Sequence, residues 1–137
     1  SHISRGVVDP ERLRHGLRDL RTSSSFMFRM SRLPKPASVA DALGGPLAEV
    51  TAAVRTALTG LGQSLIARAA PSGMDALDRS FAAFQDTAQN LMGGDSAMDA
   101  SAVAYLNNLS FALEQVRHSI ANVAGCVSDM ADAAAGP

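Results

Sequence analysis

The chain has 137 residues, of which 47% are hydrophobic and 18% are charged, a size and composition typical of one domain with a substantial core. Cys126 is the single cysteine, which excludes an internal disulfide and fits a reducing compartment. No run of about 18 apolar residues occurs, which excludes a bilayer-spanning helix within this sequence. The net charge of −1 hides an asymmetry, because residues 1–36 carry eight basic and three acidic groups, whereas residues 37–137 carry four and ten.

The sequence predicts one structured domain with short irregular ends. Ser1-His2 resembles a scar left by tag cleavage, and we expect residues 1–8 to be flexible. We expect residues 9–132 to form a single helical-bundle domain and residues 133–137 to form a frayed tail.

The first helix is predicted from Pro10 to Ser31. Asp9 is a suitable N-cap, Pro10 suits the first helical position, and Glu11 places an acid in the first turn. Helical spacing puts one apolar side at Leu13, Leu17, Leu20, Met27 and Phe28. It puts a neighbouring basic stripe at Arg14, Arg18, Arg21, Arg29 and Arg32.

Glycine- and proline-rich segments predict where the later helices are separated. The predicted breaks are Gly44-Gly45-Pro46, Pro71-Ser72-Gly73 and Gly93-Gly94. The predicted capping boxes are Ser38-x-x-Asp41, Ser72-x-x-Asp75 and Ser96-x-x-Asp99, each with Asp in place of the more usual Glu.

These signals predict a short turn around residues 39–43, a second helix from Pro46 to Ala69 and a third from Gly73 to Met92. Gly60 and Gly62 lie inside the second helix, where each costs about 1 kcal/mol relative to alanine. Close approach of another helix would account for them. The third helix has an apolar stripe at Met74, Leu77, Phe81, Phe84, Ala88 and Leu91.

The fourth helix has the most regular apolar pattern in the chain. Its stripe, at alternating steps of three and four residues, is Leu106, Leu109, Leu113, Val116, Ile120, Val123, Val127 and Met130. Such a pattern predicts a long helix packed at a shallow angle, either within one chain or across a dimer. We therefore expect an all-α fold, an antiparallel bundle of about four helices with a long fourth helix.

Two histidines and the cysteine are the candidate reactive groups. His15 in "RHGLRDL" partly matches a histidine phosphotransfer motif through Leu17 and Arg18, but Asp19 stands where that motif has glycine, so an exposed histidine on a basic helix is the favoured interpretation. His118 has no second ligand at metal-binding spacing. Cys126, near the apolar stripe, is interpreted as a buried structural thiol.

No catalytic or cofactor signature is present in the sequence. Glu114 and Gln115 could hydrogen-bond across the bundle, although a solvated face is the more ordinary interpretation. No nucleophile–base pair, phosphate loop or carboxylate pair is recognisable. We therefore expect no enzymatic activity, no metal and no cofactor.

The basic stripe is the strongest functional indication. It is either a solvated flank of the bundle or a contact with anionic lipid or a neighbouring segment. Arginine near an anionic membrane contributes about 1 kcal/mol per residue. The nearby aromatic residues are too sparse for stacking on single-stranded nucleic acid, so nucleic acid is not expected as a partner. The predicted contact residues are Arg14, Arg18, Arg21, Arg29, Arg32, Phe26 and Phe28.

Two stretches resemble the fusaric acid resistance (FUSC) family, the aromatic acid exporter-like membrane proteins of bacteria. The first is "GLRDLR", residues 16–21, with Arg29 and Leu33-Pro34 following; the second is "FALEQVR", residues 111–117. Together with their surroundings they cover about a quarter of the chain. The chain departs from the family pattern at Thr22-Ser23, where the family usually has His-Asp, and at Phe28, where it has a small residue.

The resemblance implies a soluble cytoplasmic domain of an inner-membrane transporter that exports aromatic or other organic acids. Transport would lie in the membrane part, and this domain would support assembly or regulation. Its partners would be the rest of that protein or an anionic lipid surface, with a homo-oligomer as a further option. The alternatives are a free-standing helical interaction module, acting by homodimerisation or by binding a partner helix, and a degenerate histidine phosphotransfer bundle.

Overall fold

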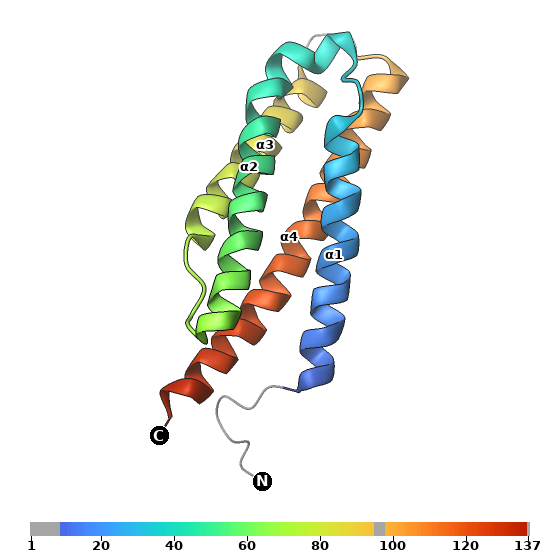
Figure 1. The fold of residues 1–137 in the computed structure, drawn as a ribbon. Helices are drawn as coiled ribbons and strands as arrows, with labels where there is room; N and C mark the ends of the chain where they lie inside the picture. The colour runs from blue at the N-terminus through green and yellow to red at the C-terminus, as the bar shows by residue number, and fades with distance from the viewer. Residues whose placement is uncertain (1–8, 95–97, 137) are drawn as a thin grey trace.

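The protein is an antiparallel bundle of four helices. A computed structural model describes residues 9–94 and 98–136. Its helices are α1 (Pro10–Arg32), α2 (Ala37–Ala67), α3 (Met74–Gly93) and α4 (Ala100–Ala135), and α4 is the longest (Figure 1). The described residues contain no strand. The predicted all-α bundle with a long fourth helix is confirmed.

Two helices, α1 and α4, each begin at an aspartate whose carboxylate caps the helix. The Asp9 carboxylate accepts a hydrogen bond from the Glu11 backbone N–H at 3.0 Å, and Pro10 opens α1 as predicted. The Asp99 carboxylate accepts one from the Ala102 N–H at 2.8 Å. Each bond satisfies one of the backbone donors that a helix start leaves unpaired, which is worth about 1 kcal/mol.

The predicted capping boxes at the starts of α2 and α3 are wrong. Pro36 is the N-cap of α2 and Gly73 that of α3, and neither helix has a side-chain capping bond. Pro34 and Pro36 disfavour helical backbone in the residues that precede them, so the helix begins immediately after Pro36 and includes Ser38. Ser96 of the third predicted box lies outside the described residues, and Asp99 is itself the cap of α4.

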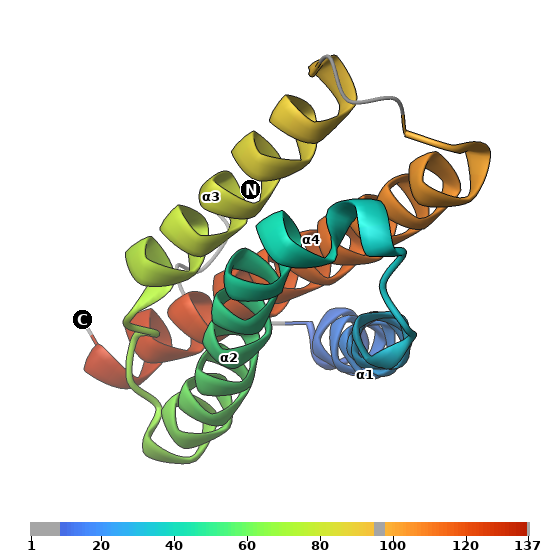
Figure 2. The same cartoon turned by 90° about the horizontal axis from the view of Figure 1, so that it is seen from above.

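The predicted break at Gly44-Gly45-Pro46 is also wrong, because α2 continues through it. Pro46 removes one helical hydrogen bond and costs about 3 kcal/mol, and each glycine costs about 1 kcal/mol more. Four aliphatic side chains on one face outweigh that, because each gains about 1.5–3 kcal/mol on burial. They are Val39, Leu43, Leu47 and Val50, all buried. The helix responds by bending, so its first turns run across the end of the bundle (Figures 1 and 2).

The core is organised around α4. The first seven residues of its predicted stripe, from Leu106 to Val127, are buried, and Met130 is half-buried. α1 packs mainly on α4 and α3 mainly on α2, while α2 also contacts α4. α4 therefore links the two helix pairs. Because α1, α2 and α3 cover its stripe, the apolar pattern of α4 is satisfied within one chain.

The α1–α4 seam differs in detail from the predicted apolar side of α1. Gly16 lies so close to α4 that a β-carbon there would sit 3.3 Å from a Val123 methyl carbon. That approach fixes the rotation of α1, so Leu20 and Met27 are buried whereas Leu17 is 39% exposed. The predicted close approach at Gly60 and Gly62 is wrong, because a β-carbon at either position would meet nothing within 4 Å.

None of the described helices combines the length and hydrophobicity that crossing a membrane requires.

Gly16, which packs against α4, and Gly62, which faces open space, should respond in opposite ways to substitution. Gly62→Ala should raise the free energy of unfolding by about 1 kcal/mol, because it adds helix propensity in open space. Gly16→Leu should lower it by about 1–3 kcal/mol, because the seam has no room for the side chain. Urea denaturation followed by circular dichroism measures both. Equal effects of the two changes would contradict the described seam.

Tyr105 on α4 is buried with an unsatisfied polar atom. Its hydroxyl has no hydrogen-bond partner among the described residues. Burial raises the pKa of Tyr105 above its usual value of 10.0, because desolvation disfavours the phenolate. The folded protein therefore holds this proton more tightly than the unfolded chain does. The contribution of Tyr105 to the free energy of unfolding is therefore fully present below pH 10, and it is lost as the pH rises from there towards the higher pKa of the folded state.

Tyr105→Phe removes the unsatisfied hydroxyl and keeps the ring. We expect it to raise the free energy of unfolding by about 1 kcal/mol at pH 7 and to reduce the loss of stability above pH 10. Denaturation curves at neutral and alkaline pH measure both effects. A less stable variant at pH 7 would mean that the hydroxyl has a partner that stabilises the fold.

Candidate functional site

The predicted basic stripe is a continuous ladder on the solvent side of α1. Steps of three, four or eight residues bring its five arginines within a narrow arc of the helix surface, opposite the buried Leu20 and Met27. From Arg14 to Arg32 the ladder extends for about 27 Å at the helical rise of 1.5 Å per residue. All five side chains are exposed. The ladder consists of Arg14, Arg18, Arg21, Arg29 and Arg32.

Most of the ladder has no counter-charge in the described part of the chain. Arg14 pairs with Glu11 of its own helix at 2.6 Å. The remaining four arginines form no ion pair with any described residue. Arg12, which is not in the ladder, points the other way and pairs with Asp129 of α4 at 3.1 Å. The acidic groups that the structure describes therefore leave most of the ladder without a counter-charge.

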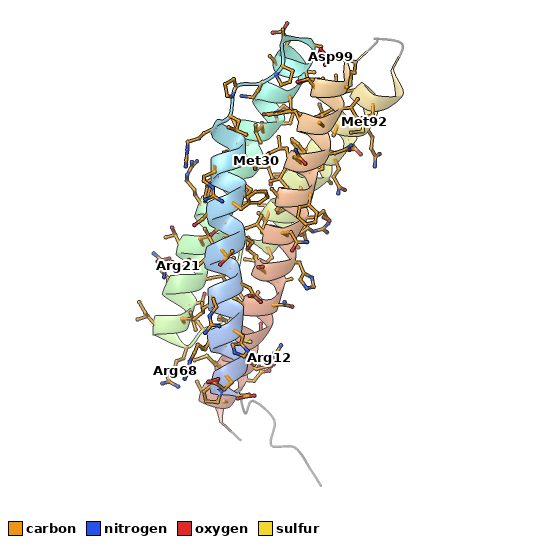
Figure 3. All side chains as sticks on the ribbon, turned by 90° about the vertical axis from the view of Figure 1, so that its right-hand side faces the viewer. Arg12, Arg21, Met30, Arg68, Met92 and Asp99 are labelled. Atoms are coloured by element: carbon orange, nitrogen blue, oxygen red, sulfur yellow. The ribbon has the colours of Figure 1, made fainter. Side chains whose placement is uncertain are left out.

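The adjoining side of α2 adds two arginines that the sequence interpretation did not single out. The Arg55 guanidinium lies 4.7 Å from the centre of the Phe28 ring, which ties α2 to α1 through a cation–π contact. Arg68 follows the last turn of α2. Figure 3 shows Arg21 and Arg68 along the same edge of the molecule, with Arg12 on the side of α4. No local sequence signal links Arg55 or Arg68 to the ladder, because only helix pairing brings them there.

Arg68 has an unusual backbone conformation. It caps α2 in the left-handed region, with φ 53 and ψ 43, and its N–H donates to the Ser64 carbonyl. It is the only residue other than glycine with positive φ in the described part of the chain. Glycine is the usual residue there, and a side chain costs roughly 1 kcal/mol or more. A long cationic side chain thus occupies a position that favours glycine.

Two exposed apolar side chains lie among these arginines. Leu17 projects from α1 within the ladder, and Ile66, two residues before Arg68, is 87% exposed. The Phe28–Arg55 contact joins the two antiparallel helices, and below it the last turns of α2, which carry Ile66, lean away from α1 (Figures 1 and 2). We call this surface the basic face: Arg14, Arg18, Arg21, Arg29, Arg32, Arg55 and Arg68 with Leu17 and Ile66.

The aromatic residues predicted to make contacts at this surface pack inward instead of standing free. Met27 is fully buried, and Phe26 and Phe28 are half-buried against the core. The Arg29 guanidinium lies 5.9 Å from the centre of the Phe26 ring. The exposed apolar material of the basic face therefore comes from Leu17 and Ile66.

Charge is distributed unequally among the helices. α1 carries six arginines and two acids, a net charge of +4, whereas α3 and α4 each carry one arginine and three acids, a net charge of −2. α2 has a net charge of −1. α1 and α3 do not touch each other in the described structure. The molecule thus has one basic edge and one acidic edge.

An open groove follows the α1–α4 seam, and no residue of α2 or α3 lines it. Its upper part, about 480 Å³, is lined by Arg18, Phe26, Gln115 and His118, and its lower part contains His15 beside Asp19 and Cys126. His15 and His118 are exposed, and Cys126 is buried. Within residues 9–94 and 98–136, no three His, Cys, Asp or Glu side chains are grouped closely enough to hold a metal ion.

Glu114 and Gln115 are both exposed. The Glu114 carboxylate pairs with Arg117 at 3.5 Å on α4 itself, and Arg117 also approaches Asp78 of α3 at 3.9 Å. These exposed pairs are each worth at most about 1 kcal/mol. The solvated-face interpretation of Glu114 and Gln115 is therefore confirmed.

Comparisons with protein-family models, with curated proteins and with solved structures gave no match to this chain. Its resemblance to the FUSC family thus stays a prediction based on residues 16–34 and 111–117.

Proposed function

We propose that the chain is a helical domain that binds an anionic lipid surface through its basic face. The observation that carries the proposal is the exposed arginine ladder, four of whose members have no ion-pair partner among the described residues. Concentrating like charges on one helix destabilises a fold through repulsion. Binding to an anionic surface offsets that repulsion, because the negative charges of the surface attract the arginines.

The mixed chemistry of the basic face favours lipid over a purely polar anionic partner. Helices that lie on membranes combine a basic rim with apolar side chains that enter the boundary between headgroups and acyl chains. Leu17 and Ile66 would supply the apolar part, and the exposed Arg14, Arg21 and Arg68 would supply the rim. Ile66 would contribute most of the free energy of apolar burial, because nearly all of its side chain is in water in the isolated domain.

The resemblance to the FUSC family gives this binding a location. We propose that the domain lies at the cytoplasmic face of the bacterial inner membrane as part of a FUSC-like transporter, where basic residues flank membrane spans. The export of organic acids would belong to the membrane part. The basic face would fix the orientation of the helical domain against the bilayer, which is an assembly role.

Co-sedimentation with vesicles tests the lipid proposal. The protein should bind vesicles of phosphatidylcholine and phosphatidylglycerol, and it should not bind phosphatidylcholine alone. Binding should weaken as salt shortens the Debye length from about 10 Å at 0.1 M to about 3 Å at 1 M. Arg14, Arg18 and Arg21 changed together to glutamine should weaken it roughly 100-fold, at about 1 kcal/mol per arginine.

The matched control changes three arginines outside the basic face. Arg12, Arg79 and Arg117 together to glutamine alter the net charge by the same amount, but these residues lie on the α4 side of α1, on α3 and on α4. This variant should retain most of the binding. An equal loss in both triple variants, or no binding by the unaltered protein, would overturn the proposal.

A further inference from the structure

The outward side of the first half of α4 is free of charge and exposed to solvent. Residues 100–113 include no Asp, Glu, Lys, Arg or His. Phe111 in this segment is 59% exposed, and Val103 is also exposed. Small or neutral side chains surround them. We call this surface the α4 outer face: Ala100, Val103, Ala104, Asn107, Asn108 and Phe111, all exposed.

Exposed apolar side chains on the flanking elements extend this surface. Leu33 follows the last residue of α1, and Met92 lies in the last turn of α3. Because both helices run antiparallel to α4, these two residues lie toward the end of the bundle at which α4 begins (Figure 1). Leu33 and Met92 are both exposed. Figure 3 shows Met30 of α1 and Met92 of α3 on either side of the upper half of α4.

These exposed residues are not needed to complete the hydrophobic core. The buried stripe of α4 is already filled by the other helices, and Phe111 points away from it. Of the six large apolar side chains exposed in the described structure, two belong to the basic face and the other four lie in the half of the bundle where α4 begins. Exposed apolar side chains concentrated on one part of a molecule are typical of a contact surface. An exposed phenylalanine such as Phe111 is the kind of residue that anchors such contacts.

We propose that the α4 outer face packs against the same face of a second copy of this chain. The absence of charge lets two identical surfaces meet without like-charge repulsion. The helices on either side then decide the orientation. They are α1 with net charge +4 and α3 with net charge −2, and they lie on opposite sides of α4 without touching.

The charges of α1 and α3 select a parallel dimer. A two-fold axis parallel to α4 places α1 of each copy next to α3 of the other, so helices of opposite net charge are neighbours on both sides. A two-fold axis across α4 places α1 over α1 and α3 over α3, so like charges meet. Electrostatic complementarity of this kind selects one arrangement and suppresses the other. The dimer is thus isologous, with the two α4 helices parallel.

Sedimentation equilibrium without lipid tests the pairing. The unaltered protein should be a dimer whose dissociation constant rises with salt. Phe111→Asp should raise that constant at least tenfold while circular dichroism remains helical. Ile66→Asp is the matched control, because it places the same charge on an exposed apolar residue of the basic face. It should leave the dimer intact. A monomer at all concentrations, or equal loss in both variants, would overturn the proposal.

Disulfide cross-linking tests the orientation. In a Cys126→Ala background, Ala104→Cys and His118→Cys place single thiols two heptads apart on the outward side of α4. In a parallel pair each position lies next to itself, so both variants should form disulfide-linked dimers on oxidation. Cross-linking at only one position would indicate an antiparallel pair, and none at either position would indicate another surface. Both results would contradict the proposal.

Discussion

The close contact between α1 and α4 at Gly16 determines which surfaces this protein presents to its surroundings. Gly16 allows α1 to approach Val123, and the Arg12–Asp129 pair holds the lower end of the same seam. The close approach at Gly16 fixes the rotation of α1 about its own axis, and the exposed Arg12–Asp129 pair contributes at most about 1 kcal/mol. Leu20 and Met27 then enter the core, and the arginine ladder on the opposite arc must face solvent. A larger residue at position 16 would affect stability and the direction of the ladder at once.

The fold tolerates local strain where the surroundings outweigh it. α2 continues through Pro46 because Val39, Leu43, Leu47 and Val50 are buried along one face, and the helix bends there instead of ending. Arg68 is different, because no comparable burial accounts for an arginine in the left-handed region. Strained residues often occur at functional positions.

The helices that could be predicted from the sequence are those whose core faces are regular. The stripe of α4 from Leu106 to Val127, and that of α3 around Phe81 and Phe84, are buried as expected, because period alone identifies a face that must be covered. Local punctuation was less reliable, since burial kept Gly44-Gly45-Pro46 helical. The ladder was also predictable from spacing. The positions of Arg55, Arg68 and Ile66 were not, because only the packing of α2 in the bundle decides which of its residues contact α1 and which face solvent.

The central claim is that the basic face, and not another surface, enters the boundary of an anionic membrane. The chain contains no tryptophan, so one introduced indole reports on its own surroundings. Ile66→Trp places it on the basic face, and Phe111→Trp places it on the α4 outer face. Adding vesicles that contain phosphatidylglycerol should shift the Ile66→Trp emission to shorter wavelength and leave the Phe111→Trp emission unchanged. A shift at Phe111→Trp alone, or no shift at Ile66→Trp when the protein is vesicle-bound, would contradict the claim.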